Sequence, residues 1–106
     1  MPKFLIKVNY TAEGMKGLQK DKASGREKAV AAACNAAGGK LDALYYALGD
    51  DDAFVVVDLP SHLHVASLCV AVGASGTVST RTVPLLTVAE MDEALGEATN
   101  YRPPGG

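Results

Sequence analysis

The chain has 106 residues, a length that fits one domain and leaves no room for a second. Apolar residues make up 48% of the chain and charged residues 21%, ordinary values for a globular protein that exclude a disordered one. The net charge of -2 provides no basic footprint for nucleic acid or for an anionic membrane, so we expect neither as a partner.

The first predicted elements are a strand and a helix. Residues 3–10, KFLIKVNY, alternate between two faces, one of them strongly apolar, which is typical of a strand. Thr11 suits the cap of a short first helical turn. The main helix is expected to begin at Ser24, which has Glu27 three residues later in a capping-box arrangement, and to end at Gly38–Gly39.

Two strands joined by a short polar connection follow. Residues 40–48, KLDALYYAL, and residues 53–59, AFVVVDL, predict the second and third strands. The connection, GDDD at 49–52, has the residue types that tolerate the backbone angles of a hairpin turn. We therefore interpret the three carboxylates Asp50–Asp52 as a turn. They are not predicted to bind a metal, because no further ligands follow at EF-hand spacing.

A helix and a fourth strand are predicted next. Ser61 is placed to cap the helix HLHVASLCVAVGASG, which is apolar on nearly all sides and is therefore expected to be mostly buried. Residues 77–86, TVSTRTVPLL, are β-branched and alternate, which indicates a strand. Pro84 within it favours an edge position, because proline cannot donate to a strand ladder.

The chain is predicted to end with a helix and a short tail. Thr87 is the expected cap of the helix TVAEMDEALGEA. We expect residues 1–100 to form one domain and 101–106 to be a flexible tail. Three apolar residues at helical spacing form the predicted buried stripe of this helix: Val88, Met91 and Leu95.

Neither the start of the chain nor its cysteines indicate export. Lysines interrupt the first apolar run and no cleavage site follows, so a signal peptide is not expected. No stretch approaches the roughly 18 unbroken apolar residues of a membrane span. Cys34 and Cys69 lie in apolar helical runs without metal-ligand spacing, which predicts buried free thiols. We therefore expect a soluble, cytoplasmic protein.

The order of elements, β-α-β-β-α-β with an additional C-terminal helix, predicts a ferredoxin-like α+β fold with a four-stranded antiparallel sheet. Its first and third strands are expected to be central. In the third strand Phe54 and Val56 point to one face and Val55 and Val57 to the other, so both faces are apolar. Because two helices cover only one face, we expect a second copy to cover the other and close a dimeric α+β barrel.

Several motifs resemble those of the GYD domain family, small proteins of the dimeric α+β barrel superfamily, over roughly residues 4–88. This chain keeps Gly49 and Asp52 of the Gly-Tyr-Asp turn but has Asp51 in the position of the tyrosine. The resemblance implies the fold and a homodimer, whereas the wider superfamily includes cofactor-free monooxygenases, isomerases, stress-response proteins and ligand-binding regulators. The matching segments are Tyr10–Gly14, Arg26–Glu27, Gly38–Leu41, Tyr45–Asp52, Pro60 and Gly76–Thr82.

A candidate small-molecule cavity follows from the strand alternation. Lys7 and Asn9 point to the barrel face, and Tyr45 and Tyr46 lie on opposite faces of their strand, so one of the two also faces the barrel. Together with Tyr10, these residues describe a mostly apolar cavity with a few polar groups, as in many ligand sites. The alternative is that they simply meet their symmetry mates across the dimer.

Three further polar residues complete the candidate set. Asp52 leads into a buried strand, where it is placed to cap backbone amides or to pair with Arg26 or Lys7. His62 and His64 are two positions apart on a helix and do not face each other, which argues against a metal site. Histidine nevertheless moves protons readily near neutral pH.

Two functional hypotheses remain. The first is a non-catalytic or accessory homodimer that binds a small molecule or serves a structural role, because no phosphate loop, Ser-His-Asp or Cys-His motif is recognisable. The second is a cofactor-free monooxygenase or isomerase acting on a small polar aromatic substrate. Neither hypothesis requires a cofactor.

Overall fold

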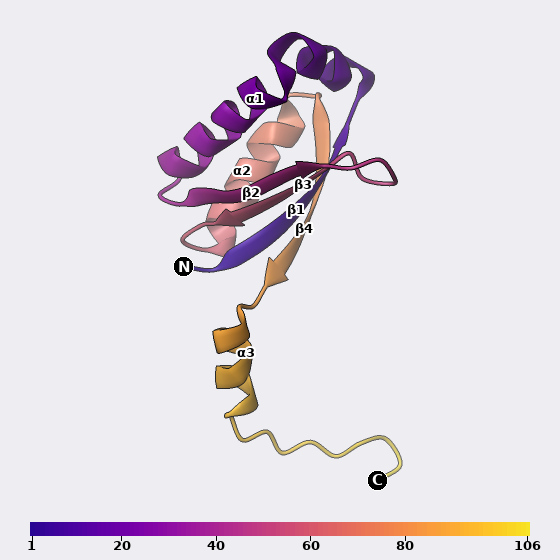
Figure 1. The fold of residues 1–106 in the computed structure, drawn as a ribbon. Helices are drawn as coiled ribbons and strands as arrows, with labels where there is room; N and C mark the ends of the chain where they lie inside the picture. Colours follow the sequence, from indigo (N-terminus) through magenta and orange to yellow (C-terminus); the bar gives the residue numbers. More distant parts are fainter.

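The computed structural model describes all 106 residues and has an open four-stranded sheet, two helices on one of its faces and a third helix that projects from one end (Figure 1). The strand order is β2-β3-β1-β4, and every neighbouring pair is antiparallel. This confirms the predicted ferredoxin-like α+β fold, with β1 and β3 in the centre and Pro84 on an edge strand. The elements are β1 (Lys3–Tyr10), α1 (Ala12–Ala36), β2 (Lys40–Tyr46), β3 (Ala53–Asp58), α2 (His62–Ala74), β4 (Val78–Leu85) and α3 (Val88–Leu95).

The core lies between the helices and one face of the two central strands. Alternation along β1 and β3 turns every second side chain toward α1 and α2, and these side chains lose nearly all contact with solvent. Burying one of the larger of these side chains, a Val, Ile or Phe, stabilises the fold by about 1.5–3 kcal/mol. The buried hydrophobic cluster comprises Phe4, Ile6, Val8, Cys34, Ala53, Val55, Val57, Leu59 and Val65.

Helix α1 is longer than the sequence predicts and contains a kink. It begins directly after Thr11, whose Oγ1 accepts a hydrogen bond of 3.1 Å from the Gly14 amide. The backbone leaves the helical region at Lys22 (φ 65, ψ 165), two residues before the predicted start at Ser24. The helix ends before Gly38, which has φ 86, a left-handed conformation that glycine adopts without strain.

Two predictions of burial are wrong for the single chain. In α2 only Val65 is buried, whereas Leu63 and Val70 are each 70% exposed. The stripe Val88, Met91 and Leu95 of α3 is also exposed. Apolar composition predicts that a helix needs a partner, and within this chain the sheet covers one side of α2 and nothing covers α3.

The opposite face of the sheet has no helix over it (Figure 1). Leu5, Phe54 and Val56 point to this face and are only partly buried, and Val83 on the edge strand is exposed. We call it the open face. No helix of the structure has the length and hydropathy needed to cross a membrane.

We predict that Gly14→Ala destabilises the protein, because a Cβ at this position would lie 1.9 Å from the carbonyl oxygen of Thr77. The expected loss is about 1–3 kcal/mol in the free energy of unfolding, measured by urea denaturation. Gly17→Ala is the matched control, since a Cβ there meets nothing within 4 Å and alanine favours the helix. Equal effects of the two substitutions would contradict the close contact at Gly14.

Candidate functional site

The start of α1 and the start of β4 come together at one end of the sheet. Thr11, at the end of β1, donates its amide to the Thr77 carbonyl at 2.9 Å, and its hydroxyl donates to the Gly76 carbonyl at 2.9 Å. The start of α1 is thereby fixed to the start of β4. The close contact between Gly14 and Thr77 belongs to the same junction.

The turn between β2 and β3 is held against β1 by several hydrogen bonds. The Asp52 amide donates to the Val8 carbonyl at 2.8 Å, and the Tyr10 amide donates to Asp52 Oδ2 at 2.8 Å. Asn9 Nδ2 donates to the Asp50 carbonyl at 2.7 Å. The triple carboxylate is therefore a turn, as the sequence predicts, and Asp52 caps a backbone amide rather than pairing with Arg26 or Lys7.

The three carboxylates of this turn serve different purposes. Asp50 is exposed, Asp52 bonds the Tyr10 amide, and Asp51 forms an ion pair with Arg81 of β4. Asp51 thus links the turn to the edge strand on the far side of β1. No group of three His, Cys, Asp or Glu side chains in the structure is arranged to hold a metal ion.

A cavity of about 120 Å³ lies between α1, α2 and the covered face of the sheet. This volume is several times the ~10–15 Å³ that one water molecule requires. Fifteen of its 17 lining residues are hydrophobic, including Ala33, Val55 and Leu68. Its polar groups come from Tyr10, Tyr46, Arg26, Cys69 and Thr80.

The phenol of Tyr46 is the most perturbed group in this cavity. Burial, together with a hydrogen bond to Tyr10, raises the pKa of Tyr46 to about 12, although the residue as a whole keeps 39% of its surface exposed. The phenol is therefore protonated at neutral pH, with its one O–H engaged by Tyr10. The guanidinium of Arg26 acts in the opposite direction, toward a lower pKa, so it lies close enough to interact with this phenol.

The structure does not bring the eight predicted site residues into one place. Tyr10 and Tyr46 line the cavity beneath the helices. Lys7 and Asn9 lie on β1 positions that face away from it, and Tyr45 is exposed on the same open face.

The two histidines lie outside the cavity as well. His62 and His64 are exposed at the start of α2, where His64 Nδ1 makes a 2.8 Å hydrogen bond with Ser61 Oγ. Ser61 therefore occupies the N-cap position without a side-chain bond to the helix backbone. This hydrogen bond gives His64 a local partner at the helix start.

The sequence analysis missed the α1 side of the cavity. Arg26, Ala29, Val30 and Ala33 all line it, and they follow the i, i+3, i+4, i+7 spacing of one helix face. This spacing is visible in the sequence and could have identified the four residues as one wall of the cavity. An arginine at the start of an otherwise apolar stripe is also the one charge that the cavity contains.

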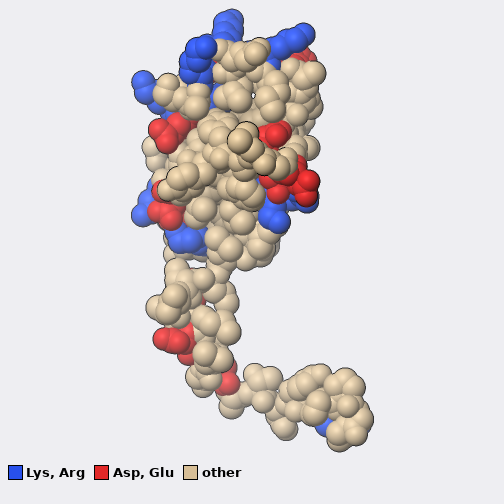
Figure 2. All heavy atoms as spheres, turned by 45° about the vertical axis from the view of Figure 1, so that its right-hand side comes forward, with Lys and Arg blue, Asp and Glu red and all other residues tan.

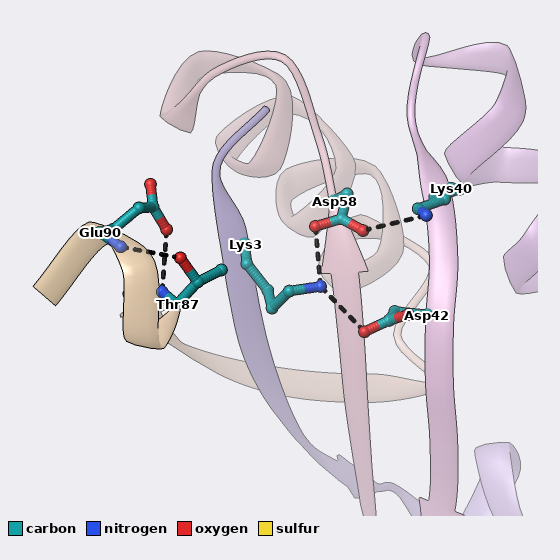
Figure 3. A network of polar contacts seen from close by, with 6 residues as sticks. All are labelled: Lys3, Lys40, Asp42, Asp58, Thr87 and Glu90. Carbon is teal, nitrogen blue, oxygen red and sulfur yellow. Dashed lines mark hydrogen bonds and ion pairs between the residues drawn. The ribbon is translucent and has the colours of Figure 1, made fainter. Parts of the chain in front are cut away.

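A second polar cluster lies at the other end of the sheet (Figure 3). Lys3 Nζ is 2.9 Å from Asp42 Oδ2 and 2.9 Å from Asp58 Oδ1, and Lys40 Nζ is 3.8 Å from Asp58 Oδ2. Hydrogen bonds to the two carboxylates raise the pKa of Lys3, and the bond from Lys3 lowers the pKa of Asp42. All members have a partner of opposite charge, so this cluster joins β1, β2 and β3 and is not a candidate ligand site.

Comparison with known proteins agrees with this architecture. The open antiparallel sheet with two helices on one face defines a ferredoxin-like α+β protein. A family model described as the GYD domain matches residues 4–95, so the chain belongs to the GYD domain family. No curated protein and no solved structure matches the chain.

We predict that Asp52→Ala destabilises the fold by about 1.5–3 kcal/mol, because the amide of Tyr10 loses a charged acceptor. Asp50→Ala is the matched control, since the Asp50 side chain is exposed and only its carbonyl bonds Asn9. Urea denaturation measures both. A loss of similar size in the two variants would contradict the assigned role of the Asp52 carboxylate.

The raised pKa of the Tyr46 phenol predicts a pH dependence of stability. A pKa raised from 10.0 to about 12 favours the neutral form in the folded protein, so its stabilising effect is complete below pH 10 and is lost as the pH rises through 12. We expect the free energy of unfolding, measured by urea denaturation, to fall more steeply between pH 10 and 12 in the wild type than in Tyr46→Phe.

Tyr45→Phe removes a hydroxyl on the open face and serves as the control, so its pH dependence should follow that of the wild type. If the free energy of unfolding of Tyr46→Phe falls in parallel with that of the wild type, the prediction is refuted.

Proposed function

We propose that this GYD domain protein is a cytoplasmic, homodimeric binding module that takes a small apolar molecule with one anionic group into the cavity beneath its helices. The observation that carries the proposal is the composition of that cavity, whose walls are almost entirely hydrophobic and whose only charge is Arg26. Ligand sites typically combine such walls with a few placed polar groups.

The polar groups favour an anion over a cation. Arg26 carries a permanent positive charge, and the phenol of Tyr46 is neutral at pH 7, so it adds no negative charge that would repel an anion. The nearest charged partner of the guanidinium in the chain is Asp21 Oδ2, 3.6 Å from Nη1, a contact too long for a hydrogen bond. Arg26 therefore retains donors for a carboxylate, sulfonate or similar group.

The open face supports the homodimer. Leu5, Phe54 and Val56 have no cover in the single chain, although β3 is otherwise as apolar as a strand buried on both faces. A second copy placed sheet against sheet would cover both open faces at once across a two-fold axis. Lys7, Asn9 and Tyr45 would then lie in the interface.

The free cysteines support an intracellular location. Cys34 and Cys69 are both free cysteines, which suits a reducing compartment. Burial raises the pKa of the Cys34 thiol, which keeps it protonated and unreactive.

Catalysis without a cofactor is the second candidate, and the cavity supports it less well than binding. Proton abstraction requires a base whose pKa lies near the working pH. The raised pKa of Tyr46 makes this phenol a donor at neutral pH, and the histidines and Lys7 lie outside the cavity. Binding therefore needs fewer additional assumptions than turnover.

A pair of small aromatic probes, compared by isothermal titration calorimetry, tests the proposed ligand class. We expect benzoate to bind one site per chain and its neutral counterpart benzamide to bind the same site, because both are close to the size that the cavity admits. Arg26→Gln should weaken binding of benzoate about tenfold, the loss of one charge-assisted hydrogen bond, and should change binding of the neutral probe less than about twofold. Equal losses for both probes would contradict anion recognition by Arg26.

A cavity-filling variant tests the location. Ala33→Leu places a larger side chain into the cavity and should weaken binding of both probes at least about tenfold. Ala32→Leu introduces the same side chain at an exposed neighbour that does not line the cavity, and should leave binding unchanged. If the two leucine variants bind the probes equally well, the ligand does not occupy this cavity.

Native mass spectrometry of the freshly purified protein reports the subunit number and any retained small molecule in one spectrum.

A further inference from the structure

Helix α3 has an apolar stripe that nothing in its own chain covers. Val88, Met91 and Leu95 are 82%, 47% and 71% exposed, although they recur at the spacing of one helix face. Figure 1 shows the helix projecting from the end of β4, away from the sheet and from both other helices. The stripe is therefore unpartnered within the chain.

An eight-residue helix is too short to be stable by itself in water. Isolated helices below about 12–15 residues are marginal even with favourable sequences. The capping box, in which Thr87 accepts from the Glu90 amide and Glu90 accepts from the Thr87 amide, stabilises only the first turn (Figure 3). The rest of the helix requires that its stripe be packed against another surface.

The connection between β4 and α3 is short. Only Leu86 and Thr87 separate β4 from the helix, and the two bonds between Thr87 and Glu90 fix its first turn. In this geometry α3 continues away from the sheet and from both other helices (Figure 1). The surface that covers α3 therefore belongs to another molecule.

Charge indicates what that molecule is. Residues 88–97 carry Glu90, Asp92, Glu93 and Glu97 and no basic residue. The four α1 lysines at positions 16, 20, 22 and 28 are exposed, and Figure 2 shows a group of Lys and Arg side chains at the end of the domain opposite the arm. Within its own chain Glu90 of the arm interacts with Lys3, but Lys3 is already paired with Asp42 and Asp58, so the α1 lysines of another copy are the better basic partners for the arm.

We propose that α3 is an exchanged arm: in a homodimer, α3 of each copy packs its apolar stripe on the other copy, with its carboxylates toward the lysines of that copy's α1. A two-fold axis perpendicular to the strands reverses the strand direction in the second copy. The α1 end of one copy then lies beside the arm of the other. Each contact then occurs twice. The proposal rests on the homodimer proposed above and adds to it a second, separate contact surface.

Two matched double variants of the full chain test the arm. Val88→Asp with Leu95→Asp adds two carboxylates within the stripe, and Ala89→Asp with Ala94→Asp adds the same two charges beside it on the same helix. By sedimentation equilibrium we expect the first pair to raise the dimer dissociation constant at least about tenfold and the second to change it less than about threefold. Equal effects of the two pairs, no effect of the first, or a wild type that is monomeric at every concentration would each overturn the proposal.

A crosslinking measurement identifies the surface. Met91 is replaced with p-benzoylphenylalanine, and chains of natural isotopic composition are mixed with uniformly ¹⁵N-labelled chains before irradiation. The expected product joins a light chain to a heavy chain, with crosslinked peptides from residues 12–36. Crosslinks confined to one chain would show that the arm folds back, and crosslinks between chains at other peptides would reject α1 as the docking surface.

The outcome is separable from that of the ligand proposal. No residue of α3 lines the cavity, so the stripe variant should bind both aromatic probes as the wild type does even when its dimer is weakened. Loss of dimerisation with retained probe binding supports the arm. Failure of the wild type to bind either probe would reject the cavity proposal and leave the result on the arm standing.

Discussion

The hydrogen bond from the Tyr10 amide to the Asp52 carboxylate fixes the end of the sheet where β1 meets the turn between β2 and β3. Tyr10 is the last residue of β1, where the strand is still paired with Val78 of β4 but has no ladder partner on β3. The carboxylate, itself held because its own amide bonds the Val8 carbonyl, replaces the missing partner. Tyr10 is thereby held beside Tyr46, and the next residue, Thr11, is placed to begin α1. One aspartate thus positions the turn, the first helix and one wall of the cavity.

A second constraint is the mismatch between an apolar sheet and the helices available to cover it. Both faces of β3 are apolar, but α1 and α2 occupy only one of them, and neither α2 nor α3 buries all of its own apolar surface. A chain of this size buries a limited fraction of its surface, so such uncovered groups are a large share of its potential stability. The open face and the exposed stripe of α3 are two parts of the same deficit, and the proposed pairing with a second copy would reduce both.

Local patterns predicted the fold well because strand alternation, caps and glycine stops are encoded by near neighbours. The Thr11 and Thr87 caps, the left-handed Gly38 and the turn at Asp50–Asp52 all occur as expected. The cavity was harder to predict, because it depends on which strand face the helices cover and on how closely α1 approaches it. The burial of α2 and α3 was predicted wrongly for a related reason: an apolar helix shows that a partner is needed, but not whether the same chain supplies it.

The structure shows where the tyrosine of the Gly-Tyr-Asp turn would lie in this chain. Asp51 occupies its position and pairs with Arg81, which lies on the open face, since its neighbours Thr80 and Thr82 point toward the cavity and Cys69 of α2. A side chain at position 51 therefore extends over the open face and not into the cavity. The turn itself is held by backbone atoms and by Asp52, neither of which depends on the residue between Asp50 and Asp52. An aspartate in place of the tyrosine therefore alters the open face and leaves the cavity beneath the helices unchanged.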